Sequence, residues 1–106
     1  MREQQDVDRA EDHASELAYL RLVTALRVQA VAMRVVADVY REVADALLDE
    51  ACTLDPCEST QRQHQATLNQ GRADVVEAEV RSVESDATTA ATQAELAQVR
   101  ARSRPR

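Results

Sequence analysis

The residues best suited to chemistry in this sequence are two cysteines and two histidines. Cys52 and Cys57 form a Cys-x4-Cys pair, and His64 follows in the same polar segment. Two thiolates and two imidazoles could supply a tetrahedral zinc site, with His13 as the fourth ligand. The spacing matches no common zinc finger, so Cys52, Cys57 and His64 are only weak metal candidates. We expect neither a metal nor any other cofactor.

The same two cysteines could instead form a disulfide. A Cys52–Cys57 bridge would lock a turn, but it requires an oxidising compartment. The chain starts Met1-Arg2-Glu3, without the basic start and apolar core of a signal peptide. We therefore expect a cytoplasmic protein with reduced thiols, and export without a leader is the alternative. A small metal- or redox-responsive protein that uses Cys52 and Cys57 remains a lesser hypothesis.

Catalytic signatures are weak. Ser59, His64 and Asp55 have the residue types of a triad, but all three lie in one polar segment that no rigid element holds. Neither histidine has a glutamate three residues before it, the spacing that carboxylate-bridged di-iron bundles require. A single glycine excludes the common phosphate-binding loops. We expect a protein without enzymatic activity.

The end of the chain is rich in arginine. Four arginines fall within the last seven residues: Arg100, Arg102, Arg104 and Arg106. The net charge of the chain is −6, so its body repels nucleic acid and only this segment could contact an anion. Side chains two residues apart point to different faces of a helix, and Pro105 favours an extended arm. A dimeric regulator that contacts nucleic acid through this tail is the second hypothesis, and a solubilising tail is the simpler explanation.

The elements that must position these residues are helices. The 106 residues include nineteen alanines, one glycine and two prolines, a composition that favours helices over a turn-rich β fold. Leu and Val together number 22, and Ile, Phe and Trp are absent, so large side chains for a thick core are scarce. The most apolar stretch, residues 22–40, contains three charged residues, and we expect no membrane span.

Seven-residue periodicity predicts a long first helix over about residues 16–52. The large residues at this spacing form the middle of an apolar face: Tyr19, Leu26, Met33, Tyr40, Leu47 and Leu54. Smaller residues beginning with Val23 and Ala30 lie on one side of this row, and Leu22, Val36 and Val43 lie on the other. The apolar arc spans roughly 160°, which is wider than one neighbouring helix can cover.

A second helix is expected within about residues 56–102. Asp55 is a typical N-cap and Pro56 a typical first helical residue. Residues 59–70 are almost wholly polar, and Gly71 could end a helix there. Beyond it, small residues in alternating three- and four-residue steps form a heptad seam: Ala73, Val76, Val80, Val83, Ala87, Ala90, Ala94, Ala97 and Ala101. Such a seam lets a bulkier helix approach closely.

The predicted architecture is an all-α, coiled-coil-like helical hairpin over residues 16–102, preceded by a polar segment (1–15) and followed by an arginine-rich tail (103–106). Because one interface cannot cover the first helix, we expect two hairpins to complete a four-helix bundle. The expected function is structural: self-association, with a dimer favoured, or binding to another helical protein. The expected interface residues are Tyr19, Leu22, Val23, Leu26, Met33, Val36, Tyr40, Val43 and Leu47.

Overall fold

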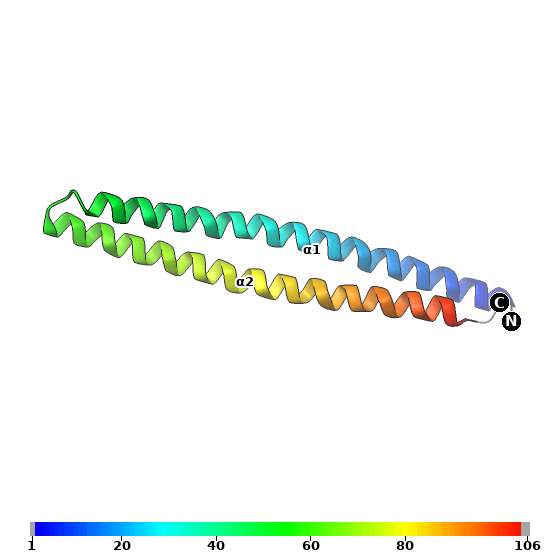
Figure 1. The fold of residues 1–106 in the computed structure, drawn as a ribbon. Coiled ribbons are helices and arrows are strands. Elements are labelled where there is room, and N and C mark those ends of the chain that lie inside the picture. The colour runs from blue at the N-terminus through cyan, green and yellow to red at the C-terminus, as the bar shows by residue number, and fades with distance from the viewer. Residues whose placement is uncertain (1, 105–106) are drawn as a thin grey trace. The chain divides into compact units, whose positions relative to one another are not determined.

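The computed structural model describes residues 2–104, which form two helices and contain no strand (Figure 1). Helix α1 spans Arg2–Ala51 and helix α2 spans Pro56–Ser103. The chain reverses direction in the four residues between them. The all-α helical hairpin that the sequence predicts is therefore confirmed.

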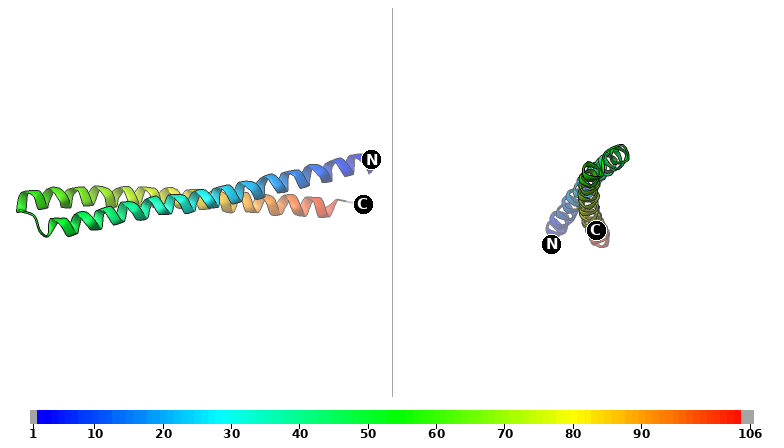
Figure 2. Two further views of the ribbon diagram at one scale, coloured as in Figure 1. Left: turned by 90° about the horizontal axis from the view of Figure 1, so that it is seen from above. Right: turned by 90° about the vertical axis from the view of Figure 1, so that its left-hand side faces the viewer.

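The hairpin divides into two compact units. The turn unit is Ala30–Ser82, and the end unit combines Met1–Gln29 with Val83–Arg106. Within each unit, a segment of α1 lies antiparallel beside a segment of α2 (Figure 2). Each surface that could carry function falls inside one of these units.

The turn forms as the sequence predicts. Asp55 caps α2, because its Oδ1 accepts a hydrogen bond from the Glu58 amide at 3.0 Å, while its carbonyl accepts one from the Ser59 amide at 2.8 Å. At the end of α1, the Thr53 amide donates to the Glu50 carbonyl at 3.1 Å and tightens the last turn. Capping of this kind satisfies amide groups that the helix itself cannot pair.

Helix α1 begins much earlier than the periodicity indicates. Residues 1–15 were expected to form a polar segment outside the hairpin, yet α1 starts at Arg2. The Gln4 side chain donates to Asp8 at 3.0 Å along the helix surface, and Asp8 and Asp12 both contact Arg104 from the far end of the sequence. Polar contacts, rather than apolar burial, extend the helix here.

Helix α2 is also more continuous than expected. The polar residues 59–70 are helical, and the helix runs through Gly71, so the prediction that a helix could end there is wrong. Gly71 has no positive φ and needs no special conformation. Further along, Thr88 and Thr89 return their hydroxyls to the carbonyls of Glu84 and Ser85, at 3.1 and 3.2 Å. The helix carbonyls thus satisfy both hydroxyls, and the two β-branched residues lie within the helix.

The seam between the helices is built from small side chains. The buried residues described are alanines and valines: Val23, Ala30, Ala37, Ala44 and Ala51 in α1, and Ala66, Ala73, Val80, Ala87, Ala90, Ala94, Ala97 and Ala101 in α2. The α2 seam follows the predicted residues from Ala73 to Ala101. No large side chain in residues 2–104 is fully buried. The core of this hairpin is therefore thin.

In α1 the buried row is not the one expected at the middle of the apolar face. The row from Tyr19 to Leu47 is only half-buried, and the alanine row beside it is buried instead. The physical reason is steric, since alanines facing the small α2 seam let the two backbones approach while larger side chains must lean over the edges. Contact with α2 therefore covers one side of the apolar arc and leaves the other open.

Candidate interaction surface

The seam of the turn unit has two edges with different chemistry. On one edge, Arg41 of α1 reaches across to α2, with Nη1 at 2.5 Å from Glu77 Oε1 and Nη2 at 3.7 Å from Asp74 Oδ1. We call this edge the charged flank. It consists of Arg41, Asp74 and Glu77, together with Val31, Arg34 and Asp38, which precede Arg41 on the same side of α1 at three- and four-residue spacing. Both partners of Arg41 are supplied by α2.

The charged flank shifts the pKa values of the groups that meet on it. The hydrogen bond from Arg41 lowers the pKa of Glu77 below its ordinary value of 4.5, and the same bond raises the pKa of Arg41. Both side chains remain about 40% exposed, so solvent screens the pair. This flank is satisfied within the chain.

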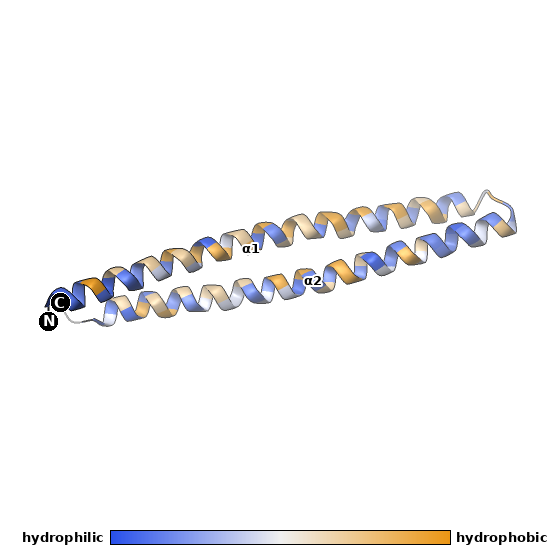
Figure 3. Cartoon of the chain, turned by 180° about the vertical axis from the view of Figure 1, so that it is seen from behind, coloured by the Kyte–Doolittle hydropathy of each residue, from blue (hydrophilic) through white to orange (hydrophobic). Residues whose placement is uncertain are grey.

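The other edge of the turn unit is aliphatic. Its large side chains are each between 41% and 60% exposed, and we call them the apolar flank: Val36, Val39 and Val43 of α1, and Leu68 and Val75 of α2. The expected interface residues Val36 and Val43 lie here, whereas Leu22, another expected interface residue, belongs to the end unit and is 45% exposed. Figure 3 shows how apolar residues recur along α1 toward the turn, while the adjoining part of α2 is mainly hydrophilic.

A groove of about 570 Å³ runs along the apolar flank. Tyr40 from α1 lines it beside Leu68, Gly71 and Val75 from α2, and Arg72 stands at its side. The exposed Gly71 leaves the floor open, since a Cβ placed there would meet nothing within 4 Å. The groove can accept aliphatic or aromatic side chains, with one guanidinium available for an acidic neighbour.

The end unit is held by ion pairs that sequence reasoning did not anticipate. Arg104 Nε lies 2.5 Å from Asp12 Oδ2 and its Nη1 lies 3.3 Å from Asp8 Oδ2, while Arg9 donates to the Arg104 carbonyl at 3.2 Å. The hydrogen bond from Arg104 holds the pKa of Asp12 below 3.8. The signal was present, because Asp8 and Asp12 are one helical turn apart on the same face.

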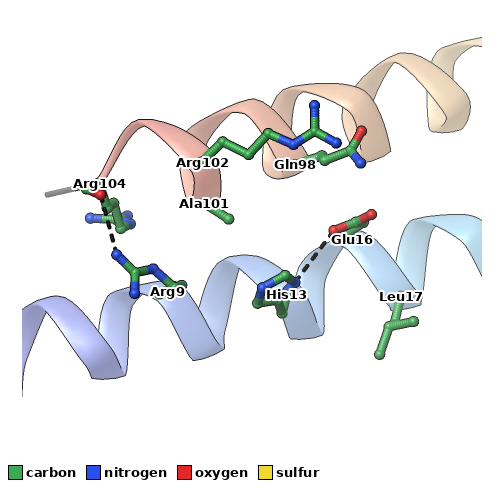
Figure 4. A pocket seen from close by; sticks show the side chains of 8 residues that line it. All are labelled: Arg9, His13, Glu16, Leu17, Gln98, Ala101, Arg102 and Arg104. Atoms are coloured by element: carbon green, nitrogen blue, oxygen red, sulfur yellow. Dashed lines mark hydrogen bonds and ion pairs between the residues drawn. The ribbon is translucent and has the colours of Figure 1, made fainter. Parts of the chain in front are cut away.

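A groove of about 580 Å³ lies beside these ion pairs, lined by Arg9, His13, Glu16, Leu17, Gln98, Ala101, Arg102 and Arg104 (Figure 4). His13 Nδ1 lies 3.6 Å from Glu16. The groove is lined by three arginines and by the carboxylate of Glu16 from α1, so it carries charges of both signs. This arrangement serves to join two helix ends.

The arginine tail is not an extended arm over the residues that the structure describes. Arg100 and Arg102 are exposed on α2, which continues to Ser103. Arg104 is half-buried and engaged by two carboxylates, and Arg106 lies outside the described residues. The hypothesis of a cationic contact through four free arginines is therefore weakened at Arg104.

The candidate chemistry near the turn is not assembled. Cys52 and Cys57 are exposed free thiols, and Cys52 Sγ contacts the Leu48 carbonyl at 3.4 Å. Within residues 2–104, no group of three His, Cys, Asp or Glu side chains lies close enough together to hold a metal ion. Cys52, Cys57 and His64 therefore do not form such a group. The Cys52–Cys57 disulfide remains a prediction. Asp55, a member of the triad considered, serves as the cap of α2.

Comparisons with known proteins supply no relative from which to transfer a function. No protein-family model, curated protein or solved structure matches the chain. Neither helix, over residues 2–104, has a stretch long and apolar enough to cross a membrane. The exposed aliphatic side chains thus remain the main feature that function must explain.

Proposed function

We propose that this chain is a non-enzymatic interaction protein that works by packing the exposed aliphatic face of α1 against a second helical surface. That surface comes from another copy of the chain or from a different helical protein. The fold supports this proposal, because α2 covers only one side of the apolar arc of α1. The other side keeps its valines in water.

The observation that carries the proposal is the amount of exposed surface. The chain exposes 7615 Å². A compact monomer of this mass, 11.8 kDa, is expected to expose roughly 5,900 Å². The surplus of about 1,700 Å² comprises polar and apolar surface, and the apolar part includes the exposed valines of α1. Contiguous aliphatic patches on soluble monomers are usually smaller than a few hundred Å² unless they bind something.

The thin seam adds a second argument. Alanine side chains bury little apolar area, and each valine or leucine moved from water to a packed interface contributes about 1.5–3 kcal/mol. A hairpin whose buried seam is mostly alanine gains little from its own core, whereas association would bury the larger residues that the hairpin leaves exposed. Association therefore stabilises the fold as well as forming a complex.

Sedimentation equilibrium between about 1 and 200 μM, combined with thermal melting at each concentration, tests the proposal. Self-association predicts a mass above 11.8 kDa and a melting temperature that rises with concentration. A monomeric mass throughout, with concentration-independent melting, would remove self-association. A folded, stable monomer that also binds no helical partner would contradict the proposal as a whole.

A further inference from the structure

The apolar flank consists of two stripes, one on each helix of the turn unit. In α1 the stripe follows alternating steps of four and three residues: Ala32, Val36, Val39, Val43 and Ala46. In α2 the same spacing gives Leu68, Arg72, Val75, Glu79 and Ser82. All ten residues are exposed. Five of them are large and aliphatic, and the other five are small or polar. Each stripe has the spacing of a second heptad seam that lacks a partner helix.

The two stripes have a common midpoint. Arg41, two residues from Val39, contacts both Asp74 and Glu77, which lie on either side of Val75 in the sequence, so Val39 and Val75 lie within about one helical turn of the same level. Each is the central residue of its stripe. Valines and alanines are arranged symmetrically about Val39, and Arg72 and Glu79 lie on opposite sides of Val75 at similar spacing.

This symmetry has an electrostatic consequence. Neither Arg72 nor Glu79 has an ion-pair partner among residues 2–104, and both are exposed. If a second copy is placed face to face, with a two-fold axis passing near Val39 and Val75, α1 lies antiparallel to the α1 of the copy. Arg72 of each chain then meets Glu79 of the other, so the charges that have no partner within one chain complement those of its copy.

We propose that the apolar flank of the turn unit is the self-association surface, that its occupant is a second copy, and that a two-fold axis near Val39 and Val75 relates the two hairpins. This inference rests on the proposed function and specifies its partner and register. The ten side chains of the two stripes are all exposed in one chain, and they would be buried together in the symmetric dimer. The charged flank, where Arg41 is paired with Glu77 and Asp74, stays in solvent.

Glutamate substitutions at matched valines test the surface. Val39→Glu places a carboxylate beside its symmetry mate at the axis and should weaken dimerisation at least a hundredfold by sedimentation equilibrium. Val31→Glu is the control, because Val31 is equally a solvent-facing helical valine, at 60% exposure, but belongs to the charged flank. It should change the dimer dissociation constant less than threefold. Helicity measured by circular dichroism establishes that both variants fold.

Charge reversal tests the two-fold register. Arg72→Glu and Glu79→Arg each create two like-charge contacts in the dimer and should each weaken it about tenfold at low salt. The double variant restores both pairs and should return the dissociation constant to within threefold of the original. Arg81→Glu, on the same helix and with the same change in net charge as Arg72→Glu, is the control and should have little effect.

The outcomes separate this inference from the proposed function. If the chain dimerises but Val39→Glu does not weaken the dimer, or if the two charge reversals are additive instead of compensating, the surface or its register is wrong while association through helices stands. If the chain stays monomeric at 200 μM, the second copy is not the occupant, and binding to a different helical protein is then the part of the proposed function left to test.

Discussion

The charged and apolar flanks of the turn unit border the same seam, yet they are satisfied in opposite ways. On the charged flank, Arg41 finds two carboxylates of α2, and the contact is complete within one chain. On the apolar flank, Val36, Val39 and Val43 each keep more than 40% of their surface in contact with water. Exposed ion pairs contribute at most about 1 kcal/mol, whereas buried aliphatic side chains contribute more. The flank with more free energy to gain is thus the one that the hairpin leaves uncovered.

The largest effect on stability should come from a larger side chain in the buried seam, compared with the same substitution on the apolar flank. Ala44 is fully buried, so Ala44→Leu must push the helices apart and should lower the free energy of unfolding by about 1–3 kcal/mol. Ala46→Leu is the matched control, because Ala46 is exposed on the apolar flank. Urea denaturation followed by circular dichroism should show little loss for Ala46→Leu. Equal losses would mean that the seam lies elsewhere.

An intermediate effect is expected at the groove floor. Gly71 lies inside α2 with open space around its missing Cβ, so Gly71→Ala should stabilise the chain by about 0.5–1 kcal/mol through helix propensity alone. Ala78→Gly, at an exposed position of the same helix, should destabilise it by a similar amount. Chemical denaturation at low protein concentration measures both changes. Destabilisation by Gly71→Ala would show that another group already fills the groove.

The smallest effect should appear on the charged flank and should depend on pH. The pKa of Glu77 is lowered in the folded state, so its contribution is present above about pH 4.5 and is lost as the pH falls through the lowered pKa. Glu77→Gln should therefore lower the melting temperature slightly at pH 7, and this difference should shrink as the pH falls from 4.5 through the lowered pKa.

The control for this pH experiment is Glu42→Gln. Glu42 is exposed on α1 and has no ion-pair partner among the described residues, so its substitution should matter little at either pH. If the effect of Glu77→Gln did not shrink at all as the pH was lowered below 4.5, the ion pair with Arg41 could not be its cause.

Sequence alone predicted the turn and the α2 seam well, because both depend on local signals. The Asp55 cap uses one residue and the amides that follow it, and the alanine and valine steps from Ala73 to Ala101 repeat without interruption. Helix periodicity and capping need no knowledge of distant residues. These elements follow from neighbours in the chain.

The features that sequence missed depend on pairing between distant segments. The first turns of α1 carry little apolar periodicity, and they are held by Arg104 from the opposite terminus. The partners of Arg41 require the register between helices, which heptad spacing does not specify by itself. The buried row of α1 was misjudged for the same reason, since the size of the residues opposite decides which row can approach.

The antiparallel pairing also determines the order in which the hairpin can close. Glu50 and Arg62, 3.4 Å apart beside the turn, close a short loop, whereas Asp12 and Arg104 are separated by 92 residues in sequence. Loop-closure entropy rises by about 0.6 kcal/mol for each doubling of loop length, so contact at the termini costs about 2 kcal/mol more than contact at the turn if nothing between has formed. Folding is therefore expected to start at residues 50–62 and to advance toward the termini.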